Sequence, residues 1–166
     1  MKQFKLARDP QFVAKLRDVV GLYLDPPERA VVFSFDEKSQ IQEFLAFLNR
    51  MVRTVTKGLA IHVILDNYAT HQHAAVQRWL ARHKRVQFHF IPTSASWLNL
   101  VERFFSELTE RQIRRLAVTS VAQLITAITE YIDHRNAHPT PFVWTATVQQ
   151  ILKKVRKAHL TLATLH

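Results

Sequence analysis

The chain has no cysteine, and only two glycines and six prolines among its 166 residues. Without cysteine it can form neither disulfides nor thiolate metal sites, a composition that fits a reducing compartment. So few glycines and prolines disfavour long linkers, and neither an internal repeat nor a low-complexity segment is visible. Because 48% of the residues are hydrophobic, we expect one domain with a real core.

Long apolar runs are also missing. No run approaches the ~18 residues that a membrane-spanning helix needs. The opening segment, "MKQFKLARDPQF", lacks the apolar centre of a secretory signal and carries an aspartate. We therefore expect neither a signal peptide nor a membrane anchor.

Acidic residues are scarce. The chain has 13 Asp and Glu against 23 Lys and Arg, for a formal net charge of +10 at pH 7. Such an excess attracts polyanions, of which nucleic acid is the commonest. Each basic cluster, such as "ARHKR", "ERQIRR" or "KKVRK", could be a solvated helix face. Their sum favours a nucleic-acid partner.

Hydrophobic periodicity predicts strands that alternate with helices between residues 30 and 115, a pattern typical of an α/β fold with parallel strands and helical crossovers. The strands are expected near 30–35, 60–65 and 86–91. Helices are expected from Asp9 as N-cap and Pro10 as first helical residue, then over 41–56, 72–83 and 97–115, after Ser120, and over 147–158.

Two aspartates stand at predicted strand ends. Asp36 follows the first strand and Asp66 the second, in "VILDNYATH". If the strands are parallel neighbours, both acids lie at the carboxyl edge of the sheet, where open α/β sheets place ligands. Adjacent carboxylates repel one another, and a divalent cation such as Mg²⁺ relieves that repulsion. The alternative is that each aspartate caps the turn that follows it.

A third acid, Glu102, lies in the predicted helix "SWLNLVERFFSELTERQIRR". Helical periodicity puts Leu98, Val101, Phe105 and Leu108 on one apolar face, and Glu102 at the border of that face. The residue either points toward the domain or extends to water as an ordinary boundary residue. Three carboxylates converging in a basic chain would suit two-metal phosphoryl transfer, with Lys and Arg holding the phosphate backbone.

Several longer stretches have a family likeness. The segments "DEKSQIQ", "IHVILDNYATH", "FIPTSASWLNLVERFFSEL" and "PFVWTA", with the leading "FKLARDPQFVAKLRDVVGLYLDPPERA", resemble the catalytic domain of DDE transposases of bacterial insertion sequences, in the mariner-related group. The resemblance runs from about residue 5 to 156. It implies a three-layer RNase H-like fold, a DNA substrate comprising transposon ends and target, and a location in the bacterial cytoplasm, with the nucleoid.

The family's catalytic and metal-binding acids carry over by motif. Asp36 matches the first in "DEKSQ", Asp66 the second in "LDNYATH", and Glu102 the third in "SWLNLVERFF". The resemblance implies hydrolytic nicking followed by strand transfer, with Mg²⁺ or Mn²⁺ on these three residues. It also implies a homodimer on paired DNA ends.

Four further residues match these motifs. Asn67 and His71 surround the second acid, and Trp97 and Asn99 precede the third. The resemblance implies supporting or DNA-contacting roles for them, and core packing is the alternative for Trp97. A zinc site built on His71 and His73 is a weaker hypothesis, since no cysteine supports it.

The chain departs from the family pattern in two respects. We expect one RNase H-like domain over 1–166, with a leading helix in 1–28, an α/β core in 30–115 and C-terminal helices in 119–158, and without the family's N-terminal helix-turn-helix. Only 30 positions separate Asp36 from Asp66, and the sequence passes directly from "DEKSQIQ" to "EFLAFLNR". Two antiparallel strands of the family fold are therefore expected to be missing.

This shortening predicts a small parallel sheet of three strands flanked by helices, with the first strand as an exposed edge open to self-association. Three functional hypotheses follow. The chain is an active transposase domain, or an internally deleted and inactive remnant that binds DNA non-specifically, or a nuclease that only hydrolyses.

Overall fold

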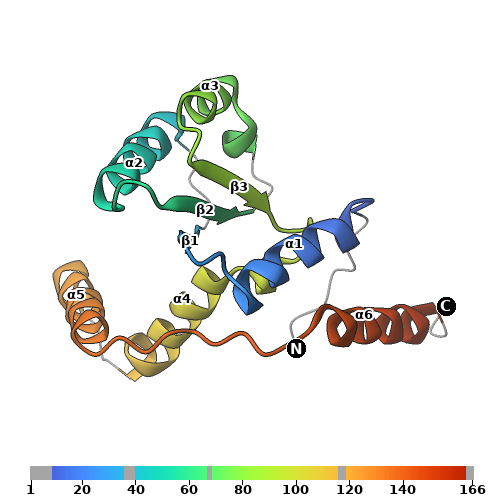
Figure 1. Ribbon diagram of the computed structural model, residues 1–166. Coiled ribbons are helices and arrows are strands. Elements are labelled where there is room, and N and C mark those ends of the chain that lie inside the picture. The colour runs from blue at the N-terminus through green and yellow to red at the C-terminus, as the bar shows by residue number, and fades with distance from the viewer. Residues whose placement is uncertain (1–8, 36–39, 67–68, 116–118, 164–166) are drawn as a thin grey trace. The chain divides into compact units, whose positions relative to one another are not determined.

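The computed structural model describes residues 9–35, 40–66, 69–115 and 119–163 (Figure 1). Contacts divide the chain into two compact units. The first comprises Met1–Asn99 and Trp144–His166, and the second comprises Leu100–Val143. In the described ranges no helix is both long enough and apolar enough to cross a bilayer.

The first unit is built on a parallel sheet of three strands, β1 (Ala30–Ser34), β2 (Ala60–Leu65) and β3 (Val86–Phe90), in the order β1-β2-β3. Five of the six residues of β2 are buried, as expected of the central strand of a covered parallel sheet. The predicted small parallel sheet flanked by helices is confirmed, and it is consistent with a reduced RNase H-like fold.

Helices α2 (Ile41–Thr54) and α3 (Ala74–Arg82) cover one face of the sheet (Figure 1). Alternation along β2 turns Ile61, Val63 and Leu65 toward these helices. The helices bury their own apolar stripes on the same cluster, whose fully or nearly buried helical members are Phe44, Leu48, Met51, Val76 and Trp79.

Helices α1 (Phe12–Leu24) and α6 (Val148–Ala163) supply the cover on the other face. Ile64 of β2 packs there with Leu16, Val19 and Val20 of α1 and with Ile151 of α6. Helices on both faces of the sheet give the first unit three layers, as the resemblance implied.

Strand β1 forms one edge of the described sheet, and all five of its residues are only half-buried. This confirms the expectation of a less covered first strand. Self-association through that edge stays a prediction.

A chain of polar contacts joins α1 to the sheet. His62 Nδ1 lies 2.9 Å from His89 Nε2, and His89 Nδ1 lies 2.7 Å from Asp18 Oδ2. Burial first, and then the neighbouring His89, lower the pKa of His62 below its ordinary value, while Asp18 opposes the shift. Because the unfolded chain takes up this proton more readily, stability is expected to decline as the pH falls below about 6.5.

Helix α1 begins later than the sequence predicts. Its N-cap is Gln11, so the prediction of Asp9 as N-cap and Pro10 as first helical residue is wrong by two positions. The Asp9 carboxylate instead accepts hydrogen bonds from the Gln11 amide at 2.9 Å, the Lys15 ammonium at 2.9 Å and the Thr93 amide at 3.0 Å. Asp9 therefore ties the start of α1 to the loop after β3.

These contacts predict a second acid-sensitive step in stability. Burial by itself would raise the pKa of Asp9, but its hydrogen bonds to Thr93, Lys15 and Gln11 outweigh burial and lower it from 3.8 to about 2. A folded-state pKa below the unfolded one stabilises the fold above pH 3.8, and that contribution is lost as the pH falls toward 2. We expect it to be about 2 kcal/mol, measured as the difference between wild type and Asp9→Asn in urea unfolding at pH 6 and pH 3. A difference that does not shrink at pH 3 would contradict the assignment.

The second unit contains α4 (Leu100–Arg111) and α5 (Val121–Ala137). Ser120 caps α5 as predicted, because its Oγ accepts a hydrogen bond from the Gln123 amide at 3.2 Å. The guanidinium groups of Arg103 and Arg135 lie 5.1 and 4.9 Å from the centre of the Phe142 ring, and both contact the Glu107 carboxylate. These contacts hold the loop after α5 against both helices.

Candidate active site

Asp66 directly follows β2, at the carboxyl edge of the central strand. Its side chain is 18% exposed, so the carboxylate is largely withdrawn from water while retaining an open side. Backbone pairing continues on both sides of it, since the Phe35 amide donates to Ile64 and the Ile91 amide donates to Leu65, at 2.9 and 2.8 Å. The acid therefore occupies a rigid position in the middle of this edge.

His71 lies against Asp66. It is fully buried in the 3-10 helix η1 (Ala69–Gln72), and its Nδ1 is 3.0 Å from Asp66 Oδ1 and 3.1 Å from the Asp66 carbonyl oxygen. The Phe44 ring packs on the imidazole at 4.8 Å between centroids, and Gln77 donates a hydrogen bond to the His71 carbonyl. Held in this way, an Nδ1–H can donate to the Asp66 carbonyl oxygen, and the imidazole, 3.0 Å from Oδ1, restricts the orientation of the carboxylate.

Asp36 and Asn67 lie outside the described residues. The position of the residue before Asp36 is nevertheless described, because Phe35 pairs with β2 through the Ile64 carbonyl. Phe35 therefore lies at the sheet edge that carries Asp66.

Asn99 is buried, 2% exposed, and its Nδ2 donates to the Phe35 carbonyl at 2.5 Å. Within the described part of the chain, its Oδ1 is buried without a hydrogen-bond partner. Tyr23 adds a second tie, since its hydroxyl donates to the Leu98 carbonyl at 2.9 Å and lies 3.2 Å from Ser34 Oγ. The segment that leads into α4 is thus fastened to the end of β1.

Tyr23 was not singled out by the sequence. Its spacing from Val19 and Val20 puts it on the apolar face of α1, where its ring lies 5.3 Å from that of Trp144. No local pattern indicates that its hydroxyl reaches a backbone carbonyl 75 positions away.

Glu102 belongs to the second unit, in the first turn of α4, and is half-buried. An acid in the first turn is favoured by the positive end of the helix dipole. The predicted helix over 97–115 is wrong in detail: a 3-10 turn, η2 (Ser96–Leu98), precedes α4, and another, η3 (Ile113–Arg115), follows it. The predicted apolar face is also only partly correct, because Leu108 is buried but Phe105 is 47% exposed.

The remaining predicted site residues, Trp97, His73 and His71, have different surroundings. Trp97 is 38% exposed, which argues against core packing for its side chain. His73 caps α3 by accepting a hydrogen bond from the Ala75 amide at 3.2 Å, and His71 contacts Asp66. Among the described residues, no three His, Asp or Glu side chains form a group that could hold a metal ion, so the histidine-based zinc site gains no support.

The chemistry of the described donors nonetheless suits a hard divalent cation. Asp66 offers a carboxylate of fixed orientation at the sheet edge, and carboxylate oxygens are the ligands that Mg²⁺ prefers. The described part of the chain contributes no thiolate ligand, because the whole sequence lacks cysteine. A site completed by further carboxylates would therefore select Mg²⁺ or Mn²⁺.

Comparison with known proteins identifies the family. The profile of the DDE superfamily endonuclease family matches residues 19–125, a range that includes Asp66, Asn99 and Glu102. The chain is also 26% identical over 96 residues to a protein from Shigella sonnei described as the insertion element IS630 uncharacterized 39 kDa protein. That alignment covers 58% of this chain and 28% of the relative. No solved structure matches.

The profile match spans well over half of the chain, and two of the acids it includes, Asp66 and Glu102, lie at a sheet edge and in the first turn of a helix. The chain belongs to the DDE superfamily endonuclease family.

Proposed function

We propose that the chain is the catalytic domain of an insertion-sequence transposase, which cuts DNA strands and transfers them in a metal-dependent reaction. Asp36, Asp66 and Glu102 would be its catalytic and metal-binding residues, within one RNase H-like domain over 1–166. The observation that carries the proposal is the fixed carboxylate of Asp66 at the carboxyl end of the central strand, 3.0 Å from the buried His71.

The ties around Asn99 support the inclusion of the other two acids. Asp36 follows Phe35, whose carbonyl accepts the hydrogen bond from Asn99. Glu102 follows Asn99 by three positions in the sequence. One buried side chain thus joins the residue before Asp36 to the segment that precedes α4.

Each residue then has a definite task. When bound, Mg²⁺ or Mn²⁺ would activate the attacking oxygen and stabilise the leaving oxygen of a phosphodiester. The three carboxylates would hold the ions, and His71 would keep the Asp66 carboxylate oriented. The excess of Lys and Arg would hold the DNA backbone, which carries one negative charge per phosphate.

A nicking assay tests this function. We expect the chain to nick duplex DNA carrying the ends of its insertion element in Mg²⁺ or Mn²⁺ and not in EDTA. Nicked products that go on to join target DNA would support strand transfer, and nicking without joined products would support a nuclease that only hydrolyses. An absence of metal-dependent nicking would contradict the proposal.

A second candidate is an inactive remnant that binds DNA without sequence preference. This candidate is favoured by the burial of β1, the strand that precedes Asp36. All residues of β1 are only half-buried, whereas most of β2 is buried. Salt-sensitive DNA binding without cleavage would identify this case.

A further inference from the structure

The amino-terminal end of the sheet, opposite Asp66, has an unusual charge distribution. From residue 44 to residue 101 the sequence contains one acid, Asp66. The same stretch contains the bases Arg50, Arg53, Lys57, Arg78, Arg82, Lys84 and Arg85. Because β2 rises about 3.3 Å per residue, its first residue, Ala60, lies roughly 20 Å from Asp66.

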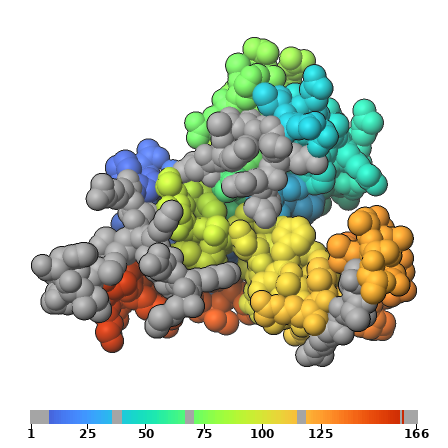
Figure 2. All heavy atoms as spheres, turned by 180° about the vertical axis from the view of Figure 1, so that it is seen from behind, coloured from blue at the N-terminus to red at the C-terminus, as the bar shows by residue number. Residues whose placement is uncertain are grey.

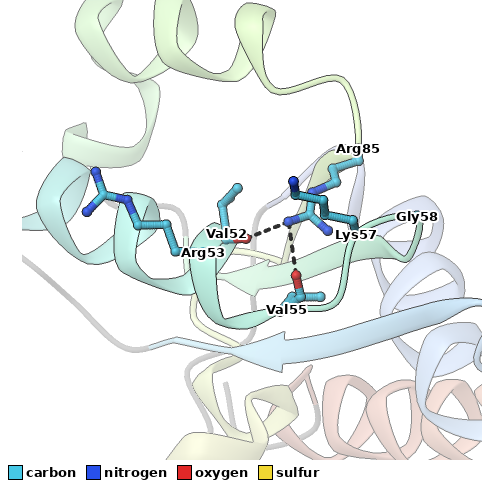
Figure 3. Close-up of a pocket in the computed structure, with 6 residues that line it drawn as sticks. All are labelled: Val52, Arg53, Val55, Lys57, Gly58 and Arg85. Atoms are coloured by element: carbon cyan, nitrogen blue, oxygen red, sulfur yellow. Dashed lines mark hydrogen bonds between the residues drawn. The ribbon is translucent and has the colours of Figure 1, made fainter.

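One of these bases, Arg85, has a structural role, and we call its contacts the Arg85 clamp. Arg85 precedes β3, and its guanidinium donates to four carbonyls at the end of α2 and in the loop that follows, those of Val52, Val55, Thr56 and Leu59, at 2.5 to 3.3 Å. Figure 3 draws the two bonds to Val52 and Val55. These bonds satisfy carbonyls that the helix terminus leaves open. Arg85 therefore supplies the positive charge that the end of α2 needs.

Four other bases lie in the last turns of α2 and α3 and in the loops that follow these helices. Arg53, Lys57, Arg82 and Lys84 are exposed, and none of them forms an ion pair within the described part of the chain. We call these four residues the amino-edge patch. Figure 3 shows Arg53 extending from α2 away from Arg85. A hollow of about 460 Å³ lies between Arg53, Lys57 and the Arg85 clamp.

The elements that carry the patch adjoin one another. Helices α2 and α3 are in contact, and their cyan and green surfaces meet at the top of Figure 2. The Ile61 amide donates to the Arg85 carbonyl at 2.7 Å, so the loops entering β2 and β3 also run side by side. At the amino end of β1, the nearest acid in the sequence is Glu28, which stands next to the exposed Arg29.

Helix-dipole stabilisation accounts for only part of the patch. Arg53 and Arg82 occupy the last turns of α2 and α3, where a cation is favourable. Lys57 and Lys84 lie beyond both helices, and Arg85 already satisfies the carbonyls at the end of α2. Four unpaired cations without an interspersed acid form a surface complementary to a chain of phosphates.

We propose that the amino-edge patch binds the phosphate backbone of duplex DNA at a position separate from the acidic edge. The inference rests on the proposed function in that it takes DNA as the partner. It adds a second contact surface, which would hold DNA beyond the strand being cut. This surface reads no sequence, because exposed Arg and Lys side chains engage phosphates alike at every base pair.

The test measures binding of a fluorescent duplex of about 30 base pairs by anisotropy, in EDTA, between about 50 and 200 mM salt. The test variant is Arg53→Gln with Lys57→Gln. The matched control, Arg17→Gln with Lys154→Gln, also removes one exposed Arg and one exposed Lys, from α1 and α6 on the other face of the sheet. Since all four side chains are exposed, thermal melting should be unchanged in both variants.

We expect the patch variant to bind about tenfold more weakly and to lower the slope of log affinity against log salt by about 2, one unit for each lost phosphate contact. The control should lose less than about threefold, by general charge alone. Equal losses in both variants, or no loss in the patch variant, would overturn the proposal. Because the assay contains no metal and needs no cleavage, its outcome is independent of the nicking assay.

Discussion

Replacement of Asp66 by Asn is expected to reduce metal-dependent nicking by roughly 10³-fold or more. A metal held by carboxylates supplies several kcal/mol of transition-state stabilisation, and about 4 kcal/mol corresponds to that factor. The amide keeps the size of the side chain, and the hydrogen bond between His71 Nδ1 and the backbone carbonyl of residue 66 does not depend on the carboxylate. The fold should therefore survive, and only the charge at the sheet edge is lost.

The control for Asp66→Asn is a variant in which an aspartate away from the candidate site is replaced by asparagine. Asp133→Asn alters an exposed residue of α5 in the same chemical way. Nicking rates of both variants would be measured on supercoiled DNA carrying the element's ends, with circular dichroism as the check on folding. Asp133→Asn should nick within about twofold of wild type, as is usual for an exposed substitution. Nicking by Asp66→Asn at the wild-type rate would remove Asp66 from the catalytic group.

The largest effect on stability is expected at Arg85. Replacement by Met keeps much of the aliphatic stem but removes the donors to the carbonyls of Val52, Val55, Thr56 and Leu59. Hydrogen bonds from a charged group contribute about 1.5–3 kcal/mol each, and water can replace some of these. We therefore expect the free energy of unfolding to fall by about 2–4 kcal/mol in urea denaturation.

Arg82 provides the matched control, because it is exposed, lies three positions earlier and forms no ion pair in the described part of the chain. Arg82→Met should change stability by less than about 0.5 kcal/mol. Arg85→Lys should fall between the two, since one ammonium cannot span four carbonyls as a planar guanidinium does. If Arg85→Met unfolds at the same urea concentration as Arg82→Met, the clamp contributes nothing to stability.

The sequence predicted the elements better than their ends. The β-branched residues of "AIHVIL" favour a strand, which was predicted over 60–65, and β2 covers the same residues. The helix predicted over 97–115 starts only at Leu100 because Asn99 is held in an extended conformation, φ −85° and ψ 116°, while its side chain bonds to Phe35. That contact joins residues 64 positions apart, so no local period could indicate it.

Asp9 is a second residue whose role depends on a long-range contact that the local sequence does not reveal. An Asp-Pro pair is a common helix start, but the Asp9 carboxylate binds Lys15 and Thr93, and α1 begins at Phe12. Arg85 looked like one member of a basic run, "ARHKR", and only the packed fold reveals its four carbonyl partners. Burial and long-range hydrogen bonds decided both cases.

For the candidate site, the sequence predicted the acids and their neighbours by motif, and the structure adds contacts for those that it describes. It places Asp66 at the edge of the sheet and the buried His71 beside it, which spacing alone could not establish. It also assigns Asn99 and Tyr23 to the ties between β1 and the segment before α4. Of these two, Tyr23 carried no sequence signal beyond its place on an apolar helix face.

The central claim is that Asp36, Asp66 and Glu102 bind divalent metal together. The most direct test is the anomalous difference map of a crystal grown with Mn²⁺. We predict a peak about 2.1 Å from a carboxylate oxygen of Asp66, with oxygens of Asp36 and Glu102 at similar distances from that ion or from a second ion about 3.5–4 Å away. A Mn²⁺ peak bound elsewhere, or a map in which Asp36 or Glu102 lies beyond reach of any ion at Asp66, would contradict the account.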